Sequence, residues 1–326
     1  MANAHLPNSH PSVTPDWRPL PFPRTPFIDS IQTKRVKGHK DTLYEGFAPL
    51  DWCGSVGRTK AVHGGFCAAT MLATAQSYAK EMSDEMGALD PVHIHIDYLS
   101  PVPQGLFHVT VRKLHSGKSS MAVQTEIVAP GTDGPAYCLA IIRLGKLEMP
   151  PGGRSIQPAI DPLPNRERDC ARGSNGAYYY ASPPTSSIRA YTPNDGESSL
   201  WSPSFGGQCS RYQWAKLDDD RLFQIEHVLL LVDLVPVIPF NYEAKNLGEA
   251  MLKFRIPTMS LTVNFYEKIN DVEWLLTVAR MQRLHNGRCD MDVHVINDEG
   301  NIVATSTQVV AMIPRMENSI KLKAGL

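Results

Sequence analysis

One carboxylate stands inside a run of aliphatic side chains, and it is the first candidate for chemistry in this sequence. Residues 228–235 consist of Asp233 and otherwise only Val and Leu. Removing an unpaired carboxylate from water is costly, so Asp233 needs hydrogen-bond partners or a role of its own. From the residues alone, a general acid or base and a salt-bridged or helix-end structural carboxylate both stay open.

Two later segments offer side chains that could hold a water molecule or a substrate. Residues 256–265 alternate polar and apolar, which predicts a strand with one polar face, made of Thr258, Ser260, Thr262 and Asn264. Gln308 lies late in a second strand-like segment, residues 303–312. Hydroxyl and amide groups can both donate to and accept from a bound water. An ordinary polar face of an edge strand is the alternative for both segments.

A histidine and two glycines open a long helical pattern. His63 precedes Gly64, Gly65 and Phe66. Backbone N–H groups at a helix N-terminus lack partners inside the helix and can stabilise an anion, so these four residues are predicted to bind substrate. Two adjacent glycines would let a substrate approach the backbone closely. His63 could serve as an acid or base, or could cap the helix and pack at its end.

The first half of the chain lacks an acid on its helix. Between residues 66 and 80 the helix carries Thr70, Thr74 and Gln76 instead. One acid-containing site per chain is therefore expected, in the second half. His95 and Asp97 alternate on a predicted strand and could line the same cleft, although strand-face polarity explains them equally well.

The elements that must position these residues come from an internal duplication. Residues 114–118 (LHSGK), followed by Met-Ala-Val, recur 170 residues later as residues 284–288 (LHNGR), followed by Met-Asp-Val. Each copy predicts a strand, a polar turn with glycine and a second strand. Solenoids and propellers use repeats of about 20 to 50 residues, so each copy here belongs to a whole subdomain.

Both halves have the same predicted order, a helix followed by antiparallel strands. The first helix opens at residues 62–66 and runs to about residue 82, and strands follow at 92–98, 106–114, 120–128 and 136–144. The second helix is predicted to start at residue 218 and to end at 236, with strands at 258–265, 274–284, 289–296 and 301–312. The first helix is rich in alanine, which lets a curved sheet approach it closely.

Two segments rich in proline lie outside the duplication and set the predicted boundaries. Residues 1–26 form an N-terminal arm, residues 27–149 the first unit, residues 150–205 a connection rich in Pro, Ser and Gly, and residues 206–326 the second unit with the acid site. The connection is predicted to be irregular and contains three consecutive tyrosines, residues 178–180. It could pack over a cleft or serve as a plain linker.

Composition excludes several classes of partner. The 326 residues are 42% hydrophobic, carry a net charge of −1 and show no stripe of Lys and Arg, which argues against nucleic acid or an anionic membrane as partner. No apolar run reaches the roughly 20 residues of a membrane span, and residues 1–26 contain seven prolines and no signal-peptide pattern, so a cytoplasmic protein is expected. The six cysteines lack metal-site spacing; reduced thiols, no metal and no cofactor are expected.

Three segments taken together resemble a known family. Residues 62–66 (VHGGF), 93–103 (HIHIDYLSPVP) and 114–119 (LHSGKS) look like those of double-hotdog, thioesterase-like proteins related to the type II acyl-CoA thioesterases. The resemblance covers about residues 27–148 and 206–315. It implies an α+β double hotdog, in which two helix-plus-antiparallel-sheet units in tandem form one continuous sheet. The type II enzymes often lack a histidine at the position of His63.

The resemblance also implies a catalytic set and a reaction. The family carries an Asp on the second-half helix, a Thr at the start of the next strand and a Gln late in the last strand, which correspond to Asp233, Thr258 and Gln308. The implied reaction is hydrolysis of an acyl-CoA or related acyl thioester, in which Asp233 activates a water. No covalent intermediate is required, and the sequence has no G-x-S-x-G elbow.

Two other functions stay open from the sequence. The fold could serve a non-hydrolytic acid/base reaction on a metabolite, such as dehydration, isomerisation or cyclisation, or it could bind acyl thioesters without turnover. A homodimer is expected, because pairing between copies would cover exposed sheet edges.

Overall fold

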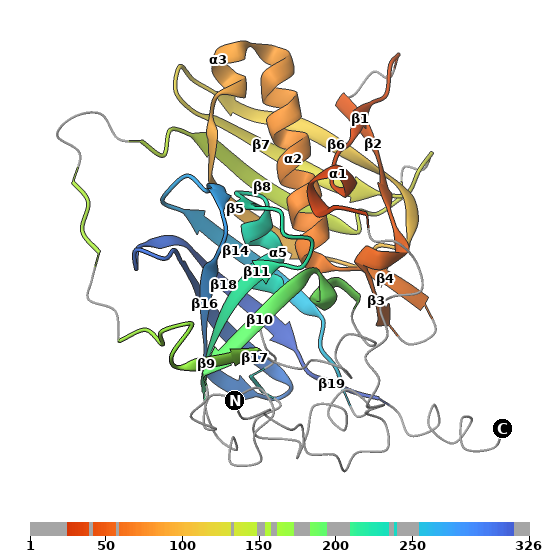
Figure 1. The fold of residues 1–326 in the computed structure, drawn as a ribbon. Coiled ribbons are helices and arrows are strands. Elements are labelled where there is room, and N and C mark those ends of the chain that lie inside the picture. Colours follow the sequence, from red (N-terminus) through yellow and green to blue (C-terminus); the bar gives the residue numbers. More distant parts are fainter. Residues whose placement is uncertain are drawn as a thin grey trace, which may run out of the picture.

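The fold is built around one antiparallel sheet. The structure, a computed structural model, describes residues 25–38, 42–56, 59–131, 134–148, 154–157, 162–172, 183–193, 209–234, 238–239 and 254–315. Figure 1 shows a large curved sheet that wraps around helix α2. The sheet has 13 strands in the order β1-β2-β6-β7-β8-β5-β14-β18-β17-β16-β11-β10-β9.

The first half supplies the longer helix and six strands of this sheet. Its elements are α1 (Phe27–Ser30), β1 (Lys34–Arg35), β2 (Thr42–Ala48), η1 (Leu50–Trp52), β3 (Cys53–Val56), β4 (Thr59–Val62), α2 (Gly64–Met82), α3 (Asp84–Gly87), β5 (Asp90–Tyr98), β6 (Gly105–Ser116), β7 (Met121–Val128) and β8 (Cys138–Gly145). The four strands after the helix lie within two residues of their predicted positions, because their alternating patterns are long.

The second half repeats this layout with a much shorter helix. Its elements are β9 (Cys170–Arg172), η2 (Pro183–Ser187), β10 (Ile188–Pro193), β11 (Ser210–Leu217), β12 (Phe223–Gln224), α5 (His227–Asp233), β13 (Phe254–Arg255), β14 (Thr258–Phe265), β15 (Asn270–Val272), β16 (Leu275–His285), β17 (Arg288–Ile296), β18 (Ile302–Ala311) and β19 (Ile313–Pro314). The repeated LHxG phrase forms the β6–β7 and β16–β17 hairpins.

The order of five strands in each half is symmetrical about the contact between the halves. The run β2-β6-β7-β8-β5 meets its counterpart β14-β18-β17-β16-β11 at the β5–β14 pair, where His95 lies opposite Thr262. Helices α2 and α5 lie on the same side of the sheet and touch one another. The predicted α+β arrangement of two tandem units that share one continuous sheet is therefore confirmed.

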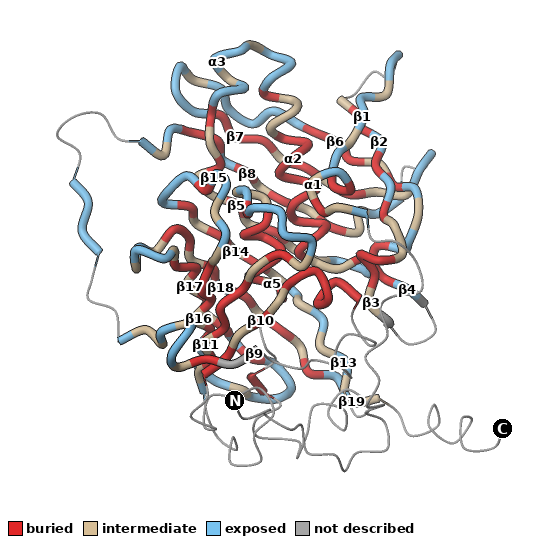
Figure 2. The backbone as a smooth tube through the Cα atoms, in the orientation of Figure 1, coloured by how far each residue is buried: buried red, intermediate tan, exposed pale blue. Residues whose placement is uncertain are grey.

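Helix α2 is the centre of the hydrophobic core. The side chains of Phe66, Met71 and Leu72 are fully buried, as are the alanines that let the sheet approach. Burial ends near Glu81, and helix α3 beyond it is exposed at the rim, as Figure 2 shows. The predicted small-residue helix inside a curved sheet is what the structure contains.

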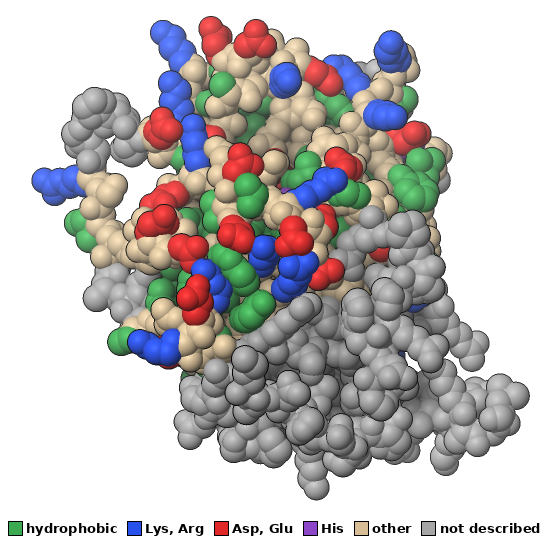
Figure 3. Space-filling model, viewed as in Figure 1, with side chains coloured by type: hydrophobic (Ala, Val, Ile, Leu, Met, Phe, Trp, Pro, Cys, Tyr) green, Lys and Arg blue, Asp and Glu red, His purple; other side chains and the backbone are tan. Residues whose placement is uncertain are grey.

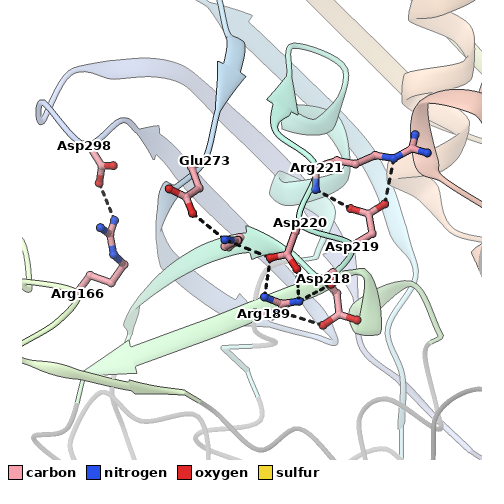
Figure 4. A network of polar contacts seen from close by, with 9 residues as sticks. Arg166, Arg189, Asp218, Asp219, Asp220, Arg221, Glu273 and Asp298 are labelled. Atoms are coloured by element: carbon pink, nitrogen blue, oxygen red, sulfur yellow. Dashed lines mark hydrogen bonds and ion pairs between the residues drawn. The ribbon is translucent and has the colours of Figure 1, made fainter.

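The predicted start of the second helix is wrong. Residues 218–220 form a turn, and α5 begins only at His227. Figure 4 shows why: Arg189 on β10 bonds to Asp218 and Asp220 with nitrogen–oxygen distances of 3.2 and 2.8 Å. Asp220 has a left-handed φ of 58°, which a right-handed helix cannot include. The acids that suggested a helix start are instead the partners of a neighbouring strand.

Part of the connection between the halves is regular where the sequence suggested irregular chain. Strands β9 and β10 extend the sheet beyond β11, and η2 leads into β10. The three tyrosines at 178–180 and residues 1–24 of the N-terminal arm lie outside the described residues.

The visible surface carries mixed charge. On the face drawn in Figure 3, Lys and Arg side chains are interspersed with Asp and Glu, consistent with the balanced composition. Within the described ranges, no helix has the length and apolar character needed to cross a membrane.

Candidate active site

The candidate site lies where the start of α2 meets the end of α5. This contact requires both glycines. A Cβ atom added to Gly65 would stand 2.6 Å from the backbone oxygen of Leu229, and one added to Gly64 would stand 2.8 Å from Asp233 Oδ2. Both distances are below any normal contact, so the glycines let the two helices approach. The interpretation from sequence attributed the two glycines instead to the close approach of a substrate to the backbone.

Both oxygens of the Asp233 carboxylate accept hydrogen bonds. Thr258 Oγ1 donates to Oδ1 at 3.0 Å, and the Gly65 backbone N–H donates to Oδ2 at 2.7 Å. His63 Nδ1 lies 3.2 Å from the same Oδ2. The Asp233 side chain is 7% exposed. Donors on both oxygens fix the orientation of this nearly buried carboxylate.

A β-bulge turns Thr258 toward this carboxylate. In the pairing of β14 with β18, Thr258 lies opposite Val310 while Ser260 lies opposite Val309, so Met259 is an extra residue. The bulge reverses the facing of the side chains on its two sides. Ser260, Thr262 and Asn264 pair with β5 on the outer face, as predicted, but Thr258 does not share their face.

Gln308 reaches the same corner from strand β18. It lies opposite Leu261, whose side chain is fully buried on the helix side, and Gln308 itself is 4% exposed. Its Nε2 donates to the carbonyl oxygen of Val232 at 3.1 Å, one residue before Asp233. The amide oxygen of Gln308 is then the group left to accept a hydrogen bond. The three predicted catalytic residues therefore meet at the end of α5.

His63 is the N-cap of α2 and a neighbour of the acid. Its Nδ1 lies 3.2 Å from the Gly65 backbone nitrogen as well as 3.2 Å from Asp233 Oδ2. Burial lowers the pKa of the His63 imidazole, and the negative charge of Asp233 opposes that shift only in part. The imidazole is thus neutral near pH 7.

Tyr98 is a site residue that the sequence interpretation missed. Its hydroxyl donates to the carbonyl oxygen of Gly64 at 3.0 Å, beneath the helix start. Burial raises the pKa of the phenol well above its usual value, and the charge of Asp233 adds to that effect. Tyr98 shares strand parity with buried Ile94 and Ile96, which is the signal that could have found it.

Other side chains that the sequence suggested point elsewhere. His95 Nδ1 bonds Thr262 Oγ1 at 2.7 Å on the outer sheet face, so His95 and Asp97 do not line the cleft with Asp233. The Phe66 ring packs against Phe27 and Trp52, with ring centroids 6.2 and 6.1 Å away. The Phe66 side chain is therefore part of the core.

Comparisons with known proteins agree with this fold. Residues 50–143 match the model of the acyl-CoA thioesterase N-terminal domain, and residues 178–312 match that of the acyl-CoA thioesterase C-terminal domain. A search of curated proteins found no match.

Solved structures give the same architecture at low sequence identity. A hot dog fold protein of unknown function from Alicyclobacillus acidocaldarius is 20% identical with a TM-score of 0.66, covering 89% of this chain and 98% of that one. A candidate thioesterase II from Thermobifida fusca is 17% identical with a TM-score of 0.68 and the same coverage. An acyl-CoA thioesterase II from Mycobacterium marinum is 14% identical with a TM-score of 0.64, covering 89% and 99%.

The fold and the two matched domains define the class as double-hotdog proteins in which both units are of the acyl-CoA thioesterase type. The chain belongs to the acyl-CoA thioesterase family, and the protein is an acyl-CoA thioesterase-like hydrolase.

Proposed function

We propose that the protein hydrolyses acyl-CoA by attack of a water that Asp233 deprotonates. The observation that carries this proposal is that both oxygens of a nearly buried carboxylate accept hydrogen bonds, Oδ1 from Thr258 and Oδ2 from Gly65. A thioester carbonyl has a good leaving group, so the reaction chiefly needs an oriented, activated water.

Thr258 and Gln308 would orient that water. Gln308 donates through Nε2 to the Val232 carbonyl, so its amide oxygen can accept one water proton, while Thr258 donates to Oδ1 and thereby orients the carboxylate that accepts the other. A water that donates one proton to the carboxylate and one to the Gln308 amide oxygen keeps a lone pair for the thioester carbon. The acid becomes protonated as the C–O bond forms. As the C–S bond breaks, this proton passes to the leaving sulfur, which releases the thiol and restores the Asp233 carboxylate.

The helix start is the proposed site for the developing oxyanion. The first N–H bonded inside α2 is that of Cys67, which donates to the His63 carbonyl oxygen at 3.1 Å. The Gly65 N–H is engaged by Asp233, so Phe66 and Gly64 are the remaining donors at this end. The sequence suggested the backbone of residues 64–66 for this role, and we propose it here for the N–H groups of Gly64 and Phe66. The role of His63 near a substrate stays a prediction.

The test is a change that removes the base and keeps its shape. Asp233→Asn retains the size of the side chain, and we expect release of free thiol from a panel of acyl-CoAs to fall about 10²- to 10⁴-fold in kcat. The melting temperature should change little. Unchanged kcat in a folded variant would refute the role of Asp233 as the base.

One observation favours a second candidate, a non-hydrolytic acid/base reaction. His63 Nδ1 lies 3.2 Å from Asp233 Oδ2, so a histidine and an acid from the two halves are adjacent. If the chemistry is hydrolysis by an Asp-activated water, His63→Ala costs much less activity than Asp233→Asn. The opposite ranking would favour dehydration or cyclisation. Negligible effects of both, in a protein that still binds acyl thioesters, would favour a binding protein without turnover.

A further inference from the structure

Three polar atoms at the start of α2 form a closed triangle. The Gly65 nitrogen lies 2.7 Å from Asp233 Oδ2 and 3.2 Å from His63 Nδ1, and Nδ1 lies 3.2 Å from Oδ2. One N–H group thus faces two acceptor candidates. The position of the imidazole proton decides which contacts are hydrogen bonds.

The three contacts are favourable together only if the imidazole proton of His63 is on Nδ1. If Nδ1 carries no proton, its lone pair faces a carboxylate oxygen at 3.2 Å, and two acceptors compete for the Gly65 N–H. If Nδ1 carries the proton, Oδ2 accepts from both His63 and Gly65, and the 3.2 Å Gly65–His63 approach is only a close contact. In a site where Asp233 is 7% exposed and His63 14%, repulsion between lone pairs is poorly screened.

We propose that His63 is a positioning residue whose neutral imidazole carries its proton on Nδ1 and donates a hydrogen bond from there to Asp233 Oδ2. This proposal rests on the proposed function above and goes beyond it by assigning the reacting oxygen. Oδ2 then accepts two hydrogen bonds, while Oδ1 accepts one, from Thr258. Oδ1 is therefore the oxygen that takes the proton of the attacking water.

The first test reads the tautomer directly in the full-length wild-type protein. Nitrogen-15 NMR of histidine-labelled protein at pH 7.5 distinguishes Nδ1–H from Nε2–H imidazoles by their nitrogen shifts. The His63 signal is assigned by its loss in His63→Asn or by its displacement in Asp233→Asn. We expect the neutral Nδ1–H form. A neutral Nε2–H form or a doubly protonated ring would overturn the proposal.

The second test uses side chains that place a donor at different points. The Asn amide nitrogen can take the place of histidine Nδ1, whereas the Gln amide nitrogen can take the place of Nε2. Ser restores the helix cap without reaching the acid. We expect kcat to fall about 10-fold or more in His63→Gln and His63→Ser, with KM little changed, and to recover in His63→Asn to within about 5-fold of wild type.

The outcomes separate positioning from capping and from base catalysis. Full activity in His63→Ser means that only the cap matters, and recovery in His63→Gln but not in His63→Asn means that Nε2 acts. Either result overturns the proposal. If the wild-type protein hydrolyses no acyl-CoA, the proposed function fails, while the tautomer measurement still decides whether His63 donates to Asp233.

Discussion

At the scale of single residues, the hydrogen bond from the Thr258 hydroxyl to Asp233 can be tested by itself. It donates to Asp233 Oδ1 at 3.0 Å. Thr258→Val keeps the shape and removes the donor, so we expect kcat to fall about 10- to 10²-fold. Thr258→Ser is the matched control, because it keeps the hydroxyl. Equal kinetics of the two variants would show that the hydroxyl is irrelevant.

Gly65 allows a prediction about stability as well as activity. Its missing Cβ would lie 2.6 Å from the Leu229 carbonyl oxygen and 2.9 Å from the Leu230 Cα, so Gly65→Ala must push α5 away. We expect a loss of about 1–3 kcal/mol in unfolding free energy, with loss of activity because Asp233 moves with α5. Gly54→Ala on β3 is the control, since nothing lies within 4 Å of its added Cβ. Urea denaturation of both variants makes the comparison.

At the scale of elements, the start of α5 makes stability depend on pH. His227 is buried, its Nδ1 accepts from the Gln224 backbone N–H at 3.0 Å, and burial lowers its pKa to about 4. Above pH 6.5 the imidazole is neutral in both the folded and the unfolded protein, so it adds no pH dependence. Between pH 6.5 and 4 only the unfolded form takes up a proton, and stability falls as pH falls.

The size of this effect follows from the shift. A pKa that drops from the usual 6.5 to about 4 corresponds to a loss of about 3 kcal/mol at pH 4. His227→Asn keeps an acceptor for the Gln224 N–H but cannot titrate. Unfolding free energies at pH 7 and pH 4.5 should therefore converge in this variant relative to wild type. A wild-type profile that the variant reproduces would contradict the assignment.

The elements also show what the sequence can and cannot predict. Strand β14 was predicted at its observed bounds, because eight alternating residues are a strong local signal. The bulge inside it was not, since a register shift is set by the partner strand β18. The start of α5 was misplaced because Asp218 and Asp220 resemble helix-start acids until Arg189, almost thirty residues earlier in sequence, is known to bind them.

The candidate-site residues differ in how far the sequence alone could point to them. Asp233 could be found because its aliphatic neighbours made a carboxylate conspicuous, whereas Thr258 and Gln308 were identified only through the family resemblance. Tyr98 bonds to Gly64 at a separation of 34 positions, and Gly65 bonds to Asp233 across the two halves at a separation of 168 positions. No local pattern encodes such contacts.

At the scale of the whole molecule, the shared sheet should make the two halves unfold together. Ile94 lies opposite Val263 and Ile96 opposite Leu261, and all four side chains are fully buried at the β5–β14 pair. Val263→Thr places a hydroxyl there, and we expect a loss of about 1–3 kcal/mol. Hydrogen exchange should then accelerate equally in β7 and β17. Thr307→Val on the exposed face of β18 is the control.

Faster hydrogen exchange in β17 alone would mean that the two halves are separate folding units.

The edges of the sheet bear on the predicted homodimer. Strand β1 has only two residues, Lys34 and Arg35, and β9 only three, so both ends of the sheet are short. Short edge strands with charged residues disfavour pairing with the sheet of a second copy, so exposed sheet edges no longer argue for a homodimer. The dimer stays a prediction, to be tested by light scattering.

The extra residue in β14 has an evolutionary consequence. Met259 is 44% exposed, and because it bulges out of the ladder, Thr258 keeps the face that is turned toward Asp233. If Met259 were deleted, Thr258 would directly precede Ser260 in a regular strand and would stay opposite Val310 on that same face. A lineage could therefore gain or lose this codon without losing the contact between Thr258 and Asp233. Relatives that differ in this way would keep both the fold and the contact, and only an alignment with a gap at this place would match their threonines.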